Sequence, residues 1–307
     1  MSEPAVLLPR LRILVAGGNG MLGSDLVQCL VRHGHDVVSP NQIDCDITHM
    51  PHIIKLTKEV WGRFDWIVNC AAYTAVDKAE TEFAAAQAVN GIAAGALAAV
   101  ASGMGARMIQ VSTDFVFDGE TELPYIEDAT PNPLGVYGKT KLFGEKQVMA
   151  QCPNAIIART SWLFGPNGNS FPKTMIEAWK AGKNLRVVGD QQGCPTYTVD
   201  LAEMIAAIIA ANPAAGIYHT CGEEGTTWFD FAVKVLESYR GLKAPSQPEV
   251  MIEKIATSDW PTPAKRPQFS VMSTDRVKAL GIPAMRHLDV TIPEFISRLE
   301  PGPEQTV

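Results

Sequence analysis

A continuous apolar run that ends in evenly spaced glycines constrains this chain most. Residues 11–16 lead directly into Gly17, Gly20 and Gly23, and a helical pattern follows over residues 21–33. Such a run is typical of a buried parallel strand. Lacking Cβ, Gly17 permits a tight turn, Gly20 a close approach to the backbone, and Gly23 close helix–strand packing. The segment therefore predicts the first strand–turn–helix unit of an α/β fold.

The start of that helix predicts a phosphate-binding site. Unpaired N–H groups and the positive end of the helix dipole favour anions there. Glycines spaced GxxGxxG at a first strand–helix junction are typical of dinucleotide binding, although a glycine-rich turn alone has the same letters. We expect this turn to bind NAD(P).

The choice between the two nicotinamide cofactors depends on the second predicted strand, residues 36–39. NAD-binding folds place an acid at the end of this strand for the ribose hydroxyls. Here Pro40 and Asn41 follow it, and the first carboxylates are Asp44 and Asp46. The missing acid slightly favours NADPH. No arginine is present there to bind the 2′-phosphate, so the choice between NADPH and NADH stays open.

Apolar strands alternate with helical patterns through the first half of the chain. Further strands are predicted at 65–69, 107–112 and 155–159, with helices at 78–102 and 136–150. This alternation predicts a Rossmann-type, doubly wound parallel sheet. We assign residues 11–160, with later interleaved segments, to an NAD(P)-binding domain.

After residue 160 the alternation loosens, and we assign residues 161–300 mostly to a smaller C-terminal, substrate-binding lobe. Two proline-rich stretches break up the end of this region. The expected strands are 185–188 and 216–220, the helices are 199–211 and 228–239, and the proline-rich stretches are 244–248 and 261–267.

Composition excludes several classes of protein. The net charge of −7 argues against a nucleic-acid partner, which requires a basic face. No stretch approaches the ~20 apolar residues of a membrane span, and residues 1–10 lack a signal peptide's features. The six cysteines show no CxxC pair or Cys/His metal spacing, so we expect no metal site and reduced thiols. A soluble, cytoplasmic protein is expected.

Tyr137 and Lys141 form a second group of candidate functional residues, after the glycine turn. They are four residues apart on a predicted helix, so both side chains project from one face. A nearby ammonium favours the phenolate, and we expect it to lower the pKa of Tyr137 toward neutrality. The YxxxK pattern also occurs by chance on exposed helices. The pair indicates a catalytic site only if other site residues lie nearby.

Hydroxyl side chains at the end of the 107–112 strand are such additional site residues. Ser112, Thr113 and Asp114 lie where parallel sheets place their ligands. Thr113 can hydrogen-bond a carbonyl oxygen and stabilise the alkoxide that forms as hydride arrives. Capping of a loop is the alternative role. Together the three features predict a reductase site.

These residues, read together, resemble the extended short-chain dehydrogenase/reductases, and more narrowly the dTDP-4-dehydrorhamnose reductase family. The resemblance covers residues 11–299. It rests on the glycine turn, on Asn69–Glu80, on Ser112–Asp114, on Val136–Lys141, on Arg159–Trp162, on Gly189–Thr196 and on Pro261–Pro267.

The resemblance implies an NAD(P)H-dependent reduction of the C4 keto group of dTDP-4-dehydro-L-rhamnose to dTDP-L-rhamnose. Thr113, Tyr137 and Lys141 would be catalytic, with Tyr137 the proton donor and Lys141 also on the nicotinamide ribose. Asp114 and Trp162 would lie beside the sugar, although Trp162 also suits a core aromatic. The implied cofactor contacts are Gly17, Asn19, Gly20, Met21, Leu22, Asp46, Ile47, Ala71, Ala72 and Tyr73.

Arg266 is our own candidate for the nucleotide diphosphate, because a guanidinium matches phosphate geometry; a surface arginine between prolines is the alternative. Some family members bind Mg²⁺ through glutamates at a dimer interface, one just after the glycine turn. Here Gly23, Ser24 and Asp25 stand at that place. We therefore do not expect metal-mediated dimerisation, and a homodimer stays open.

Two other activities compete with the reductase. An epimerase remains possible in principle, whereas a dehydratase is disfavoured because Phe115, not Glu, follows Asp114. The non-catalytic β subunit of methionine adenosyltransferase resembles the same family and keeps a YxxxK, so fold and cofactor motif do not prove turnover. The intact Ser112–Asp114 and Trp162 favour the enzyme.

Overall fold

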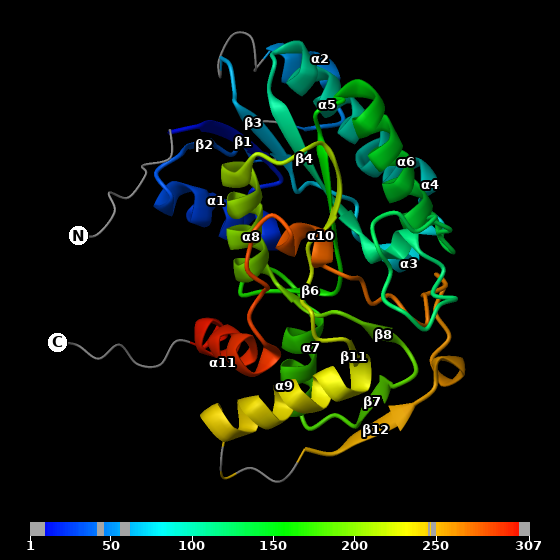
Figure 1. The fold of residues 1–307 in the computed structure, drawn as a ribbon. Coiled ribbons are helices and arrows are strands. Elements are labelled where there is room, and N and C mark those ends of the chain that lie inside the picture. Colours follow the sequence, from blue (N-terminus) through cyan, green and yellow to red (C-terminus); the bar gives the residue numbers. More distant parts are fainter. Residues whose placement is uncertain (1–9, 42–45, 56–61, 245, 247–249, 301–307) are drawn as a thin grey trace, which may run out of the picture.

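A six-stranded, fully parallel sheet forms the upper half of the molecule (Figure 1). The computed structural model describes residues 10–41, 46–55, 62–244, 246 and 250–300. In spatial order the strands are β10 (Gly216–His219), β5 (Ile156–Thr160), β4 (Arg107–Thr113), β3 (Trp66–Asn69), β1 (Arg12–Ala16) and β2 (Asp36–Val38). The predicted strands and the Rossmann-type fold are confirmed.

Helices cover both faces of this sheet, as a doubly wound fold requires. On one face α1 (Met21–Arg32) packs against α8 (Thr198–Ala211) over a cluster that includes Val15, Val68 and Ile205. On the other, α5 (Ala94–Gly103) and α6 (Val136–Gln151) close a second cluster. The short helix α2 (Met50–Lys55) lies at the top of the view in Figure 1, and α10 (Asp275–Lys278) contacts β10. The sheet is therefore buried on both sides, which explains its continuous apolar strands.

The lower lobe is built around aromatic side chains. Phe164, Phe231 and Phe295 are fully buried between α7 (Phe171–Lys180), α9 (Trp228–Lys243) and α11 (Leu288–Leu299). Three two-stranded ladders complete it: β7 (Leu185–Val188) with β12 (Ile252–Ile255), β8 (Gln192–Gly193) with β11 (Thr226–Thr227), and β6 (Leu163–Phe164) with β9 (Thr196–Tyr197). Since α8 and β10 return to the upper sheet, the chain crosses between the lobes several times (Figure 1).

The alanine-rich stretch 78–102 is not the single helix that we predicted. It is divided into α3 (Val76–Ala79), α4 (Phe83–Gln87), a π-helical segment (Ala88–Ala93) and α5. The π-helical turn directs Asn90, whose side chain accepts from Tyr73 N at 2.9 Å and donates to Thr140 Oγ1 at 3.1 Å. Tertiary hydrogen bonds therefore accompany a π-helical turn within a stretch that stays helical from Phe83 to Gly103.

One helical stretch within the described residues, Phe83–Gly103, is long and apolar enough to cross a membrane by length and composition. This differs from our expectation that no stretch comes close. The stretch packs against α6 and the sheet, and 44% of its most apolar window is buried. Its apolar character is that of a core helix.

Candidate active site

One large hollow, about 1180 Å³, lies at the carboxyl ends of β1, β3 and β4, and residues of both lobes line it. The order of the strands reverses at β1, and open α/β sheets bind ligands at such a reversal. All sixteen residues that the sequence singled out line this hollow. The structure therefore brings the predicted site residues together around one hollow, and their contacts are described below.

The glycine turn has the geometry that a dinucleotide requires. Gly17 has a φ of +77°, and a Cβ on it would lie 2.6 Å from the backbone nitrogen of Ala71. A Cβ on Gly23 would lie 2.1 Å from the carbonyl oxygen of Gly17. The helix that follows has no acidic side chain in its first turn to compete for its N–H groups. The turn thus fits a pyrophosphate at the start of α1.

Asp46, Ile47 and Thr48 line the end of the hollow near β2. The Asp46 carboxylate accepts from Thr48 N at 2.9 Å and from Thr48 Oγ1 at 2.7 Å. These hydrogen bonds lower the pKa of Asp46. Asp44, the other carboxylate of this region, lies outside the described residues.

Among the described residues that line the hollow, the only Lys or Arg side chains are Lys141 and Arg266, and Lys141 lies at the catalytic end.

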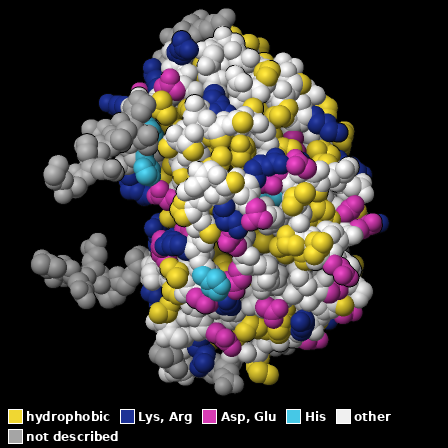
Figure 2. Space-filling model, viewed as in Figure 1, with side chains coloured by type: hydrophobic (Ala, Val, Ile, Leu, Met, Phe, Trp, Pro, Cys, Tyr) yellow, Lys and Arg dark blue, Asp and Glu magenta, His cyan; other side chains and the backbone are white. Residues whose placement is uncertain are grey.

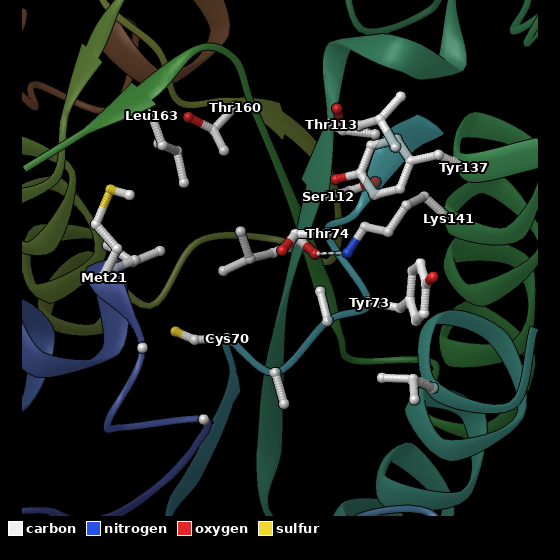
Figure 3. A pocket seen from close by; sticks show the side chains of 18 of the residues that line it. Met21, Cys70, Tyr73, Thr74, Ser112, Thr113, Tyr137, Lys141, Thr160 and Leu163 are labelled. Atoms are coloured by element: carbon white, nitrogen blue, oxygen red, sulfur yellow. Dashed lines mark hydrogen bonds between the residues drawn. The ribbon is translucent and has the colours of Figure 1, made fainter. Parts of the chain in front are cut away.

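Thr113, Tyr137 and Lys141 converge at the opposite end, where β4 ends and α6 begins (Figure 3). The Thr113 side chain lies close enough to the Tyr137 phenol to influence its pKa. Lys141 is only 4% exposed, and its Nζ donates to the carbonyl oxygen of Val111 at 2.7 Å. The ring of Phe115 meets that of Tyr137 edge to face at 5.6 Å. The three predicted catalytic side chains therefore lie together, in positions set by β4 and α6.

The expectation that Lys141 lowers the pKa of Tyr137 is wrong for this structure. Burial raises the pKa of Tyr137 to about 12, and burial lowers the pKa of Lys141 to about 8. Both groups are removed from water, and a low-dielectric surrounding favours the uncharged form of each. The phenol is therefore held protonated, the state that a proton donor needs.

A buried ionic network lies beneath these residues, and the sequence did not reveal it. Glu145 accepts from Ser112 Oγ at 2.5 Å, and from Arg159 Nε at 3.0 Å and Nη2 at 2.7 Å. Arg159 is 1% exposed and lies over the ring of Phe117. Glu145 favours the charged form of Lys141, one helical turn away. In the sequence, only the four-residue spacing of Tyr137, Lys141 and Glu145 could have indicated that Glu145 lies on the same helix face.

Asp114 presents an unpaired carboxylate oxygen at this end of the hollow. Its Oδ1 accepts from Thr113 Oγ1 at 3.0 Å. No bond of good geometry reaches its buried Oδ2 from the described residues, because the nearby Ser270 hydroxyl, which lowers the pKa of Asp114, donates to the carbonyl oxygen of Gln192 at 3.3 Å. Burial raises the pKa of Asp114 to about 6. A buried carboxylate with one unsatisfied oxygen can accept from, or when protonated donate to, a ligand hydroxyl.

Trp162 forms part of the opposite wall, in a strained conformation. Its φ is +45°, which is uncommon for a bulky residue and often marks a functional site. Its ring stacks on that of Trp228 with centroids 3.5 Å apart, and a Cβ on Gly193 would lie 2.4 Å from it. Trp228 lines the hollow too, and the sequence did not distinguish it from a core aromatic.

Arg266 lines the hollow as predicted, but its guanidinium is already engaged. Nη1 and Nη2 donate to the carboxylate of Asp77 at 3.1 and 2.8 Å. Within the same Asn69–Glu80 segment, Glu80 accepts from Val136 N at 2.8 Å and so caps α6. This segment follows β3. Asp77 connects it to Arg266, and Glu80 connects it to α6, the helix of Tyr137.

Asp25 is the acidic residue of the Gly23–Asp25 segment that follows the glycine turn. It is 5% exposed, and its carboxylate accepts from Asn167 Nδ2 at 3.1 Å and from the Thr198 hydroxyl. Burial raises its pKa. These bonds tie α1 to α8 and to the loop before α7.

The comparisons with known proteins agree with this geometry. Residues 11–300 match the family described as "RmlD substrate binding domain". The dTDP-4-dehydrorhamnose reductase of Streptomyces griseus is 40% identical over 296 residues, covering 95% of each chain.

Two solved structures share the fold throughout. The dTDP-4-dehydrorhamnose reductase of Clostridium acetobutylicum superposes with a TM-score of 0.88 at 37% identity, over 94% of this chain and 99% of that one. The enzyme of Bacillus anthracis, solved in complex with NADP, gives 0.86 at 33% identity over the same shares. The predicted resemblance is confirmed: this chain belongs to the dTDP-4-dehydrorhamnose reductase family.

Proposed function

We propose that this protein reduces the C4 keto group of dTDP-4-dehydro-L-rhamnose with NAD(P)H, yielding dTDP-L-rhamnose. The observation that carries the proposal is the placement of Thr113, Tyr137 and Lys141 in one hollow with the glycine turn at its other end. Membership of the family supports the substrate.

The glycine turn and its neighbours hold the cofactor. Asn19, Gly20, Met21 and Leu22 bind the pyrophosphate at the start of α1. The adenosine and ribose path is lined by Gly17, Asp46, Ile47, Ala71, Ala72 and Tyr73. Reduced nicotinamide, when bound, supplies the hydride.

Three side chains prepare the keto group for reduction. The Thr113 hydroxyl and the Tyr137 phenol donate hydrogen bonds to the C4 oxygen and stabilise the charge that develops on it. Tyr137 then transfers its proton, which its raised pKa retains until that charge appears. Lys141 binds the ribose hydroxyls, with Val111 O fixing the direction of its ammonium.

The sugar nucleotide occupies the part of the hollow shared by the lobes. Asp114 hydrogen-bonds a sugar hydroxyl through Oδ2, Trp162 packs against the deoxysugar, and Arg266 binds the diphosphate. Asp77 orients Arg266 for this role by accepting from its two terminal nitrogens. We propose NADPH as the preferred cofactor, since β2 ends without an acid; the NADP complex of the B. anthracis relative supports this choice.

The test follows the absorbance of the reduced nicotinamide, with NADPH and NADH in parallel, on addition of the 4-keto sugar nucleotide. Oxidation that depends on the sugar nucleotide is expected, and faster with NADPH. Tyr137→Phe should lower kcat by about 10²–10⁴-fold. The control Tyr218→Phe removes a hydroxyl that donates to Ala214 O, and since neither residue lines the hollow it should retain the rate. Tight NADPH binding without any oxidation would instead favour a non-catalytic binding protein.

A further inference from the structure

We propose that Cys29, His33 and Glu203 form a zinc site on the outside of the upper lobe. The Cys29 thiol, the His33 imidazole and a Glu203 carboxylate oxygen all lie within 4.8 Å of one another. None of the three lines the hollow of the reductase site. The proposal is independent of the function proposed above.

The backbone brings these ligands together. Cys29 and His33 are one turn apart at the end of α1, where His33 N donates to Cys29 O at 3.0 Å. Glu203 lies on α8, which packs along α1. No metal spacing is evident in the sequence because the third ligand comes 170 residues after His33. Only the packing of the two helices completes the set.

The carboxylate of Glu203 is already oriented for monodentate binding. Oε1 accepts from Arg32 Nη2 at 2.6 Å, while Oε2 lies 2.8 Å from His33 Nε2. A metal between Oε2 and Nε2 leaves the Arg32 bond in place, and such outer hydrogen bonds commonly orient a ligating carboxylate. Arg32, His35 and the Cys29 thiol are the other titratable groups that face this pair.

The donor set selects the metal. Thiolate, imidazole and carboxylate together suit Zn²⁺, with water as a fourth ligand, whereas Mg²⁺ and Ca²⁺ prefer oxygen donors. The ligand atoms lie within 4.8 Å of one another, and a tetrahedral site has ligand separations on the order of 3–4 Å, so metal binding would draw them closer by less than about 2 Å. The thiol proton leaves as the S–Zn bond forms, and the imidazole keeps its proton on Nδ1.

The site has access to solvent. The side chains of His33 and Glu203 are 47% and 46% exposed, and both border a second hollow of about 670 Å³ between α8 and residues 282–286. Cys29 is 1% exposed and forms the inner side of the site. A bound zinc would link the C-terminal end of α1, the cofactor-binding helix, to α8.

Cobalt provides the test, because only a thiolate ligand gives the intense ligand-to-metal charge-transfer absorption of Co²⁺. The full chain, without a histidine tag and after removal of metals, is titrated with Co²⁺ and then with Zn²⁺. We expect one Co²⁺ per chain with charge-transfer absorption, displaced by Zn²⁺. We also expect zinc to raise the Tm.

Variants separate the site from general metal binding. Cys29→Ser and His33→Ala should abolish the charge-transfer absorption, and His33→Ala, an exposed position, should keep the fold. Cys152→Ser removes another buried thiol, and His287→Ala removes an exposed histidine that pairs with Glu224. Both controls should retain the cobalt spectrum. Absence of the absorption in the unmodified chain, or its survival in Cys29→Ser, would overturn the proposal.

Discussion

The guanidinium of Arg266 and the carboxylate of Asp77 form a bidentate pair across the wall of the active-site hollow, with Nη1–Oδ1 and Nη2–Oδ2 distances of 3.1 and 2.8 Å. The pair joins residues 189 positions apart. It holds a segment of the proline-rich stretch, residues 261–267, against the loop after β3. A cation held in this way keeps its charge and loses little conformational freedom when it binds an anion.

Replacing Arg266 by Ala should raise the KM for the sugar nucleotide by about 10–100-fold with a smaller effect on kcat, since charge-assisted hydrogen bonds contribute about 1.5–3 kcal/mol. Asp77→Asn keeps the cation but loosens it, and should raise KM less. Steady-state kinetics measure both, with Arg186→Ala, which removes an exposed ion pair with Glu253, as control. An unchanged KM in Arg266→Ala would exclude the diphosphate role.

Asp114 should make the stability fall as pH rises. Its pKa is about 6 in the folded protein and ~3.9 when unfolded, so between these values the folded state binds more protons. The ionised carboxylate therefore costs up to about 3 kcal/mol above pH 6. Asp114→Asn removes that cost, and its urea midpoint should exceed the unmodified protein's at pH 8 and approach it at pH 4.

Asp118 supplies a control of opposite sign for this measurement. Hydrogen bonds from Glu120 N and Asn132 lower its pKa, so its carboxylate stabilises the fold above the unfolded pKa and loses that contribution as pH falls. Asp118→Asn should therefore lose stability at pH 8. A pH-independent difference for Asp114→Asn would show that its ionisation is not linked to folding.

Removing only one partner of the buried Glu145–Arg159 ion pair should lower the stability of the protein strongly. Glu145→Ala leaves Arg159 charged and unpaired in the core, and should lower the free energy of unfolding by about 3–5 kcal/mol. Glu145→Leu combined with Arg159→Met should recover most of that loss. Urea denaturation gives the coupling energy. Exact additivity of Glu145→Leu and Arg159→Met, each also measured alone, would contradict a coupled pair.

Gly23→Ala tests the packing of the glycine turn. The new Cβ would meet Gly17 O at 2.1 Å, and the backbone must move. We expect NADPH affinity to fall about 10–100-fold, which corresponds to the 1–3 kcal/mol of an overpacked site. In Gly103→Ala the Cβ meets nothing within 4 Å, and replacing glycine in a helix should stabilise by roughly 0.5–1 kcal/mol. Cofactor titration and Tm measure the two effects.

Local patterns determined the sheet, the glycine turn and the positions of the candidate residues. Apolar strands ending in glycines or hydroxyls carry this information within a few neighbouring residues, and parallel strands bring their carboxyl ends together. For that reason Thr113 and the Tyr137–Lys141 pair could be placed in one site with Gly20 from the sequence alone. The four-residue spacing on α6 needed no knowledge of tertiary contacts.

Only the tertiary structure decided what surrounds these residues. Burial, not the neighbouring ammonium, controls the pKa of Tyr137, and burial depends on how β4 and α6 pack. The π-helical turn in the 78–102 stretch places Asn90 where it accepts from Tyr73 N and donates to Thr140 Oγ1. Arg266 meets Asp77, and Glu203 meets His33, across 189 and 170 residues. No local pattern encodes such pairs, because the partners are neighbours only after the chain has folded.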